Sequence, residues 1–207
     1  MLVLASGSPR RRAMLPRLGF VFTTARPDID ETPHAGEAAA EYVARLSREK
    51  AAAIGEDGLI IAADTTVVDG AHILGKPMDA ADAEAMLKRL RGRAHVVHTG
   101  LTLHDTTTGA AHTAITTTNV EMRDYADAEI DAYIAAGEPF DKAGGYAIHD
   151  PIFHPVARIQ GCYANVMGLP MCTLCGMLRD ELRMNVPAAV ACSPDGGWCE
   201  FDPAASH

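Results

Sequence analysis

The sequence lacks long apolar runs, an excess of basic charge and a cysteine framework, and each absence excludes a class of protein. No stretch approaches the roughly 18 apolar residues of a membrane helix, and we expect no signal peptide because the N-terminus has no basic region followed by an apolar one. The formal net charge of −9 argues against general affinity for nucleic acid or anionic membranes, since both require a basic field. Five cysteines form an odd, sparse set that favours reduced thiols in the cytoplasm over disulfides.

What is present suits one globular unit. Of the 207 residues, 48% are hydrophobic, which is enough for a sizeable core in one domain. We predict that residues 1–185 form this domain. Beyond them the composition shifts to Pro, Gly, Ala and Ser, which predicts a poorly ordered tail over 186–207. Cys192 and Cys199 lie in that tail, and the sequence indicates no role for either.

Strand and helix patterns alternate along the chain and predict an α/β fold, with helices packed on a mixed sheet. Apolar runs predict buried strands at 2–5 and 59–63, and a turn at 69–70 predicts a hairpin. Two longer strands are expected at 95–104 and 111–122. Apolar spacing and capping residues predict helices at 9–18, 37–54, 79–90, 127–136 and 170–182.

The first strand–helix junction carries the strongest chemical signal. Arg10, Arg11 and Arg12 occupy the first turn of a helix, where the macrodipole disfavours cations by about 0.3–1 kcal/mol each. A bound phosphate reverses that effect, because the guanidinium groups and the hydroxyls of Ser6 and Ser8 can then all face one anion. The alternative is a helix start whose arginines are solvated or paired with carboxylates elsewhere.

Asp64 closes the apolar run 59–63, so we expect it at the C-terminal end of a buried strand. Open α/β sheets bind ligands outside such strand ends, which suits a metal ligand or a general base. Aspartate also starts turns through hydrogen bonds to its own backbone. The residues alone leave both interpretations open.

Several other patterns are weaker. Residues 70–76 resemble most of a P-loop, but Pro77 stands where that motif needs Ser or Thr and the segment lies in a predicted hairpin; Lys76 can still reach a phosphate from a loop. Residues 141–146 form a glycine-rich bend, which suits close ligand approach or a plain turn.

Cys172 and Cys175 have C-x-x-C spacing on an apolar helix without a second pair for zinc, so we expect them to pack in the core. The histidines are scattered, and none is assigned to a metal.

Six segments in fixed order make the chain resemble the Maf family over about residues 2–183. They are SGSPRR at 6–11, REKA at 48–51, ADT at 63–65, GKP at 75–77, DKAG at 141–144 and VMGLP at 166–170. The resemblance implies an elongated α/β fold with two lobes around a deep cleft, similar to the inosine triphosphatases. It also implies a nucleoside triphosphate pyrophosphatase, in which water attacks the α-phosphorus to give a monophosphate and pyrophosphate.

The same resemblance assigns roles to residues. Asp64 matches the proton acceptor, and Glu31 with Asp64 is implied to hold a divalent metal, Mg²⁺ or Mn²⁺. Such an ion suits a site with few carboxylates, because Mg²⁺ binds through one or two of them plus substrate phosphates. The residues expected to bind substrate are Ser6, Ser8, Arg10, Arg11, Lys50, Thr65, Lys76, Lys142 and His149.

In this family, three positions determine which nucleobase the site accepts, and they correspond here to Arg11, Thr65 and His149. The first two match the subgroup that hydrolyses dTTP and UTP, whereas His149 stands where that subgroup usually has glutamine. Imidazole can still hydrogen-bond a base edge, so dTTP and UTP are expected, with modified pyrimidine nucleotides or 7-methyl-GTP as alternatives. As partners we expect the nucleotide and a second copy of the chain in a homodimer, and neither nucleic acid nor membrane.

Two other classes of function stay open. The family's association with septum formation suggests a regulator of cell division that binds nucleotide with little turnover. A thiol redox protein using Cys172 and Cys175 is a further alternative. The sequence does not decide between clearing nucleotides from the pool and slowing division.

Overall fold

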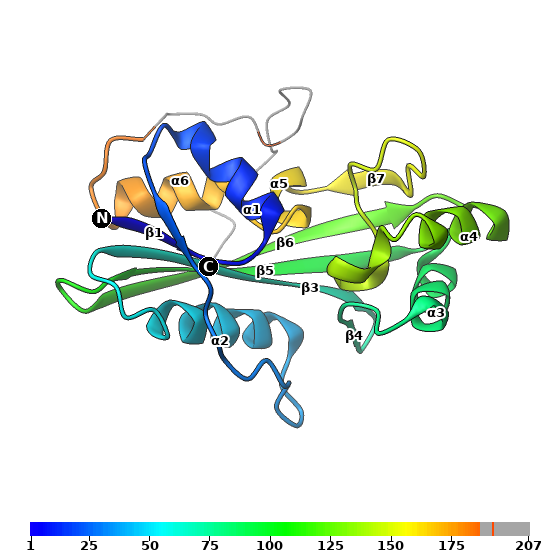
Figure 1. The fold of residues 1–207 in the computed structure, drawn as a ribbon, viewed down its shortest axis with the longest axis horizontal. Helices are drawn as coiled ribbons and strands as arrows, with labels where there is room; N and C mark the ends of the chain where they lie inside the picture. The colour runs from blue at the N-terminus through cyan, green and yellow to red at the C-terminus, as the bar shows by residue number, and fades with distance from the viewer. Residues whose placement is uncertain (187–191, 193–207) are drawn as a thin grey trace.

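The computed structural model of the protein describes residues 1–186 and Cys192. Helices cover both faces of a single sheet (Figure 1). The seven-stranded sheet has the order β2-β1-β3-β5-β6-β7, and β4 pairs with β3 beside this path. Pairs β1–β2 and β1–β3 are parallel, and the other pairs are antiparallel. The strands are β1 Leu2–Ala5, β2 Thr23–Ala25, β3 Leu59–Asp69, β4 His72–Leu74, β5 Ala94–Asp105, β6 Ala110–Met122 and β7 Val156–Gln160. The predicted mixed α/β fold is confirmed.

Helices pack on the two faces of the sheet near β1 and β3. Helix α2 lies on one face, and α1 and α6 lie on the other (Figure 1). A hydrophobic core lies on each face, and alternate residues of β3 contribute to one core or the other. Ile60 belongs to the core that includes Ala51 of α2, whereas Ile61 belongs to the core that includes Leu174 of α6. The helices are α1 Pro9–Met14, α2 Ala39–Ala52, α3 Ala80–Leu90, α4 Asp127–Ala135, α5 Tyr163–Val166 and α6 Met171–Asp180. Within the described ranges, none of them is long and apolar enough to cross a membrane.

A third core lies at the other end of the sheet, where α3 and α4 pack near β4 and β7 (Figure 1). Leu87 of α3, Ile130 of α4 and Val120 of β6 are completely buried there. Asp79 caps α3 by accepting a hydrogen bond from the backbone N–H of Asp82 at 2.8 Å, as its position before that helix predicts. The implied division into two lobes stays a prediction, as does the domain boundary at 185.

Most long elements match their predicted ranges, and the differences concern short ones. The first helix ends at Met14 and continues as a 3-10 turn to Leu18, so it is shorter than predicted. Strands β2 and β7 and helix α5 were not predicted, because three to five residues give too little periodicity to recognise. Apart from Val186 and Cys192, the predicted tail lies outside the described residues.

Close packing of α2 on β5 depends on Gly100, which pairs in register with Asp64. A Cβ atom added at Gly100 would lie 2.2 Å from the carbonyl oxygen of Val43 and 2.7 Å from the backbone nitrogen of Ala44. Both atoms belong to the backbone of α2 and cannot rotate away. The missing side chain therefore sets how closely α2 approaches the sheet beside Asp64.

We predict that Gly100→Ala lowers the free energy of unfolding by about 1–3 kcal/mol, because overpacking displaces α2 from β5. Urea unfolding followed by circular dichroism measures this change. Gly55→Ala is the matched control, since a Cβ there meets no atom within 4 Å. A loss of stability in Gly55→Ala equal to that in Gly100→Ala would show that the close approach of α2 is not the cause.

Candidate active site at the open edge of β3

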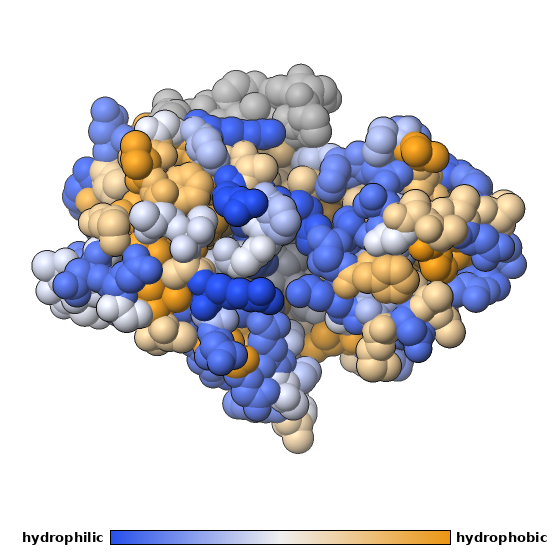
Figure 2. All heavy atoms as spheres, in the orientation of Figure 1, coloured by the Kyte–Doolittle hydropathy of each residue, from blue (hydrophilic) through white to orange (hydrophobic). Residues whose placement is uncertain are grey.

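A cavity of about 510 Å³ opens beside β3, where the edge of that strand changes neighbour. Strand β1 pairs with residues 59–62 of β3 and β4 pairs with residues 67–69, whereas β5 pairs along residues 59–68. Since β5 fills one edge, β1 and β4 share the other, and residues 63–66 lie between them. Figure 2 shows hydrophilic residues around a hollow near the middle of this face.

The cavity brings together every residue predicted to act. It is lined by Ser6, Ser8, Arg10, Arg11, Glu31, Lys50, Asp64, Thr65, Lys76, Lys142 and His149. These residues come from segments spread over more than 140 positions of the sequence. The structure therefore gives them one location, while their individual roles stay predictions.

The position of Asp64 corrects the sequence analysis. Strand β3 does not end at this residue but continues to Asp69, so Asp64 lies in the middle of the strand. The following residues, Thr65 to Val68, are all β-branched, which favours extended structure. Because side chains alternate along a strand, Asp64 faces α2 and Thr65 faces the opposite side. The open edge lets both reach the cavity.

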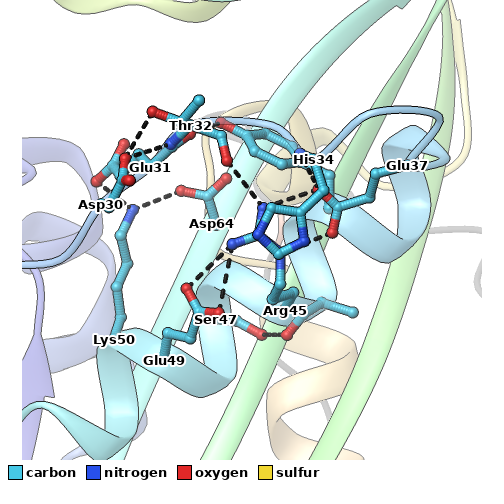
Figure 3. A network of polar contacts seen from close by, with 12 residues as sticks. Asp30, Glu31, Thr32, His34, Glu37, Arg45, Ser47, Glu49, Lys50 and Asp64 are labelled. Carbon is cyan, nitrogen blue, oxygen red and sulfur yellow. Dashed lines mark hydrogen bonds and ion pairs between the residues drawn. The ribbon is translucent and has the colours of Figure 1, made fainter.

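Lys50 of α2 links two carboxylates on the α2 side of the cavity (Figure 3). Its Nζ lies 2.6 Å from Oδ1 of Asp64 and 2.8 Å from Oε1 of Glu31. The side chains of Lys50 and Asp64 are only 9% and 11% exposed, so the charges offset one another in a poorly hydrated place. Partial burial alone would raise the pKa of Glu31, but the hydrogen bond and charge of Lys50 outweigh it and lower that pKa.

This arrangement fits a divalent ion shared with a ligand. Glu31 and Asp64 converge on one positive charge, and Mg²⁺ needs only one or two carboxylates when phosphates supply further oxygens. No group of three or more His, Cys, Asp or Glu suited to a metal occurs among residues 1–186 and Cys192. The two carboxylates present therefore fit a divalent ion that oxygens of a bound ligand also coordinate.

Arg45 holds the segment that carries Glu31 against α2 (Figure 3). Its guanidinium donates to both carboxylate oxygens of Glu37, at 2.7 and 2.8 Å, and to the carbonyl oxygen of Thr32 at 3.2 Å. The Tyr42 hydroxyl donates to the carbonyl oxygen of Glu31 at 2.8 Å. Residues 26–34 have no regular secondary structure, so these contacts place Glu31.

Arg11 lies on the other side of the cavity and bonds to uncharged oxygens. Its Nε donates to the carbonyl oxygen of Gly168 at 2.6 Å, its Nη2 to Oγ1 of Thr65 at 3.0 Å and its Nη1 to Oγ of Ser6 at 3.4 Å. Burial lowers the pKa of Arg11, and the charge of Asp64 opposes that shift. Gly168 has a φ of 99°, and a Cβ there would crowd Arg11 and Thr65, so glycine is required.

Arg10 is paired with a carboxylate, a contact of the kind that the alternative for the arginine cluster expects. It pairs with Asp141, whose Oδ2 lies 2.6 Å from Arg10 Nη1. The other carboxylate oxygen of Asp141 lies 2.6 Å from Nζ of Lys142. One carboxylate thus holds two cations at the cavity wall. Because α1 has only six residues, side chains rather than the helix dipole dominate the potential here.

Lys76 and His149 complete the predicted set. Lys76 follows the predicted β3–β4 hairpin and lines the cavity, so the segment is not a P-loop. Burial, followed by the charges of Arg10 and Lys142, lowers the pKa of His149. This imidazole is therefore mostly neutral near pH 7.

The remaining cysteine and histidine patterns lie away from the cavity. Cys175, on α6, packs in the core as predicted. Burial raises the pKa of its thiol to about 11, which disfavours thiolate chemistry. Cys172 Sγ lies 3.1 Å from Cys192 Sγ, and Cys199 lies outside the described residues. His95 is buried against the Tyr146 hydroxyl at 2.8 Å, and burial lowers its pKa to about 4.

The residues that line the cavity but were not predicted as site residues include Asp141, Tyr42 and Arg26. Asp141 stands beside Lys142 in the glycine-rich bend, and a carboxylate next to a predicted phosphate ligand was the available signal. Tyr42 falls within the predicted helix 37–54, and no role in the site was predicted for it. No local pattern marks Arg26, because only folding brings it next to Gly7.

Comparisons with known proteins agree on one family. The model of the family described as Maf-like protein matches residues 1–181. A dTTP/UTP pyrophosphatase of Myxococcus xanthus is 49% identical over 177 residues, which cover 83% of this chain and 87% of that protein. Proteins of the same name from Hahella chejuensis and Vibrio cholerae are 46% and 44% identical, and the matches cover 86% and 82% of this chain and 91% and 92% of theirs.

The ion pair between Arg45 and Glu37, which holds the segment that carries Glu31, predicts that the free energy of unfolding depends on pH. The hydrogen bond from Arg45 is the main cause that lowers the pKa of Glu37 from 4.5 to about 2. A carboxylate with a lowered folded-state pKa stabilises the fold above its unfolded pKa and loses that effect as pH falls through the folded value. We therefore expect the stability difference between wild type and Glu37→Gln to be full at pH 7 and to shrink between about pH 4.5 and pH 2.

Urea unfolding of both proteins from pH 2.5 to pH 7 measures this difference. Glu41→Gln, at an exposed position in the first turn of α2, is the control for removing a carboxylate. A difference between wild type and Glu37→Gln that stays constant down to pH 2.5 would show that the ion pair with Arg45 is not its source.

Proposed function

We propose that this chain, which belongs to the Maf family, is a nucleoside triphosphate pyrophosphatase that acts on dTTP and UTP. The observation that carries the proposal is a carboxylate pair, Asp64 and Glu31, facing a group of cations across one cavity. The relatives from Myxococcus, Hahella and Vibrio that carry the name dTTP/UTP pyrophosphatase support it. Modified pyrimidine nucleotides belong to the same proposed substrate class.

The charges around the cavity suit a triphosphate. Its lining includes Arg10, Arg11, Lys50, Lys76 and Lys142, although the whole chain has a net charge of −9. A nucleoside triphosphate carries close to four negative charges, which these cations would offset. The phosphates must compete with Asp141 for Arg10 and Lys142. This competition favours a ligand with several charges over a monophosphate, which would help the product to leave.

Asp64 is the group proposed to accept the proton of the attacking water. Lys50 holds Oδ1 of this carboxylate at 2.6 Å, which leaves Oδ2 to take the proton as water attacks the α-phosphorus. The bond to the bridging oxygen then breaks, and pyrophosphate leaves with the electron pair. A positioned carboxylate contributes about 10²–10⁴-fold to such a step.

Mg²⁺ or Mn²⁺ completes the proposal, with Glu31 and Asp64 as its protein ligands. Such an ion polarises phosphoryl oxygens and acidifies bound water. Both carboxylates already converge on the ammonium of Lys50, so they lie close enough together to share one cation.

Arg11, Thr65 and His149 are proposed to recognise the base. Arg11 and Thr65 bond to each other beside Gly168, and a mostly neutral His149 can donate or accept a hydrogen bond. We further propose a homodimer in the cytoplasm with the nucleotide as its substrate, and with neither nucleic acid nor membrane as partner. A regulator of cell division that binds nucleotide with little turnover is the second candidate, and the intact Asp64–Lys50 pair favours the enzyme.

We predict that the purified protein with Mg²⁺ or Mn²⁺ converts dTTP and UTP to monophosphate and pyrophosphate. Asp64→Asn should lower kcat by about 10²–10⁴-fold, because an amide cannot take the proton. Ion chromatography of the products separates pyrophosphate from orthophosphate. The control is Asp57→Asn in the exposed turn before β3, which should retain full activity.

Three outcomes would contradict this mechanism. Release of orthophosphate would show attack at another phosphorus. Equal turnover in Asp64→Asn would remove the proposed base. Tight binding of dTTP by the wild type without turnover would support the regulator instead.

A further inference from the structure

A chain of hydrogen bonds runs from the cavity into the core behind it. Arg11 Nη2 donates to Oγ1 of Thr65 at 3.0 Å, and Thr65 Oγ1 lies 2.9 Å from Oγ1 of Thr99. Thr99 Oγ1 in turn donates to the backbone carbonyl oxygen of Asn165 at 3.1 Å. Arg11 and Thr65 line the cavity, whereas Thr99 and Asn165 are completely buried.

The direction of every proton in this chain follows from its two ends. A carbonyl oxygen only accepts, so the single hydroxyl proton of Thr99 belongs to the bond with Asn165. Thr99 Oγ1 can then only accept from Thr65, which commits the hydroxyl proton of Thr65 as well. The guanidinium of Arg11 only donates and takes one lone pair of Thr65. Thr65 is left with one accepting lone pair and no proton for a ligand.

The inner end of the chain is fixed. The side-chain amide of Asn165 donates from Nδ2 to the carbonyl oxygen of Val97 at 3.1 Å and to Oγ1 of Thr118 at 3.0 Å. The backbone N–H of Gly168 donates to the carbonyl oxygen of Asn165 at 2.9 Å. The oxygen that accepts from Thr99 is therefore held by both β5 and the turn that carries Gly168. Rotation of the Thr99 hydroxyl would leave that bond unmade inside the core.

We propose that Thr99 is a positioning residue that makes Thr65 a pure hydrogen-bond acceptor, and that the site thereby selects bases with a ring N–H. This inference rests on the proposed function. Uracil and thymine present N3–H between two carbonyl oxygens. Thr65 accepts from N3–H, and an N–H of Arg11 that the protein does not use donates to a neighbouring ring carbonyl. Cytosine has an accepting N3, so two lone pairs would face each other.

The first test changes the substrate and leaves the protein intact. 3-Methyluridine 5′-triphosphate lacks the N3–H, and 5-methyluridine 5′-triphosphate is its matched control because it carries the same added methyl group elsewhere. We expect kcat/KM for pyrophosphate release to fall by at least about 100-fold for the 3-methyl compound and less than about threefold for the 5-methyl compound, relative to UTP. Equal turnover of the two methylated nucleotides would overturn the inference.

The second test compares Thr99→Val with Thr99→Ser. Valine frees the hydroxyl proton of Thr65 to rotate toward a ligand, whereas serine keeps the chain of bonds. The preference is measured as the ratio of kcat/KM for UTP to that for CTP. In Thr99→Val this ratio should fall by about tenfold or more, mainly because kcat/KM for CTP rises. In Thr99→Ser the ratio should stay within about threefold of the wild-type value. A purely structural role would lower both rates together and leave their ratio unchanged, and that result would contradict the proposal.

The two tests separate this inference from the proposed function. Absence of pyrophosphate release from UTP would refute the function, and Kd values of UTP, CTP and the two methylated nucleotides, measured by calorimetry, would then decide the inference. Hydrolysis of UTP without discrimination at N3 would refute the inference alone. If Thr99→Val does not fold, the comparison of methylated substrates with the wild-type protein still decides it.

Discussion

The site depends on one constraint, which is that β3 continues past the end of its neighbour β1. Strand β5 supports β3 along residues 59–68, while residues 63–66 have neither β1 nor β4 beside them. The strand therefore stays rigid where its edge is open. Side chains of both its faces reach the same cavity, and consecutive residues can serve different purposes. Asp64 contacts Lys50 of α2, and Thr65 contacts Arg11 and the hydroxyl of Thr99.

The cavity collects positive charge on an acidic protein by holding cations with carboxylates. Asp141 contacts both Arg10 and Lys142, and Lys50 lies between Glu31 and Asp64. Partly buried cations would repel one another if they were unpaired. The carboxylates hold these cations in place, and in the proposed function an anion with several charges would replace Asp141. The same contacts orient the groups that the proposed reaction needs, so stability and function share them.

Packing adds precision to this arrangement at two glycines. Gly100 allows the backbone of α2 to lie directly on β5 opposite Asp64, which sets the reach of Lys50. Gly168 turns the chain with a positive φ, so that its carbonyl oxygen meets Arg11 without a side chain in the way. The long helices and strands were predictable because their apolar residues recur with a clear period, and Asp79 additionally caps α3. Strands β2 and β7 were not, because their stability comes from the neighbours they pair with.

The sequence by itself determined the mixed α/β class, the long elements and the residues of the six ordered segments. Those features are local, since periodicity, capping and short motifs are set by neighbours along the chain. Only the tertiary structure decided the partner of each charge and the place of Asp64 within β3. It also showed the bond between Thr65 and the buried Thr99, 34 residues apart, and the contact of Arg10 with Asp141, 131 residues apart. Such contacts leave no local pattern, because sheet pairing and helix packing create them, and no residue near Arg10 or Thr65 in the sequence specifies its partner.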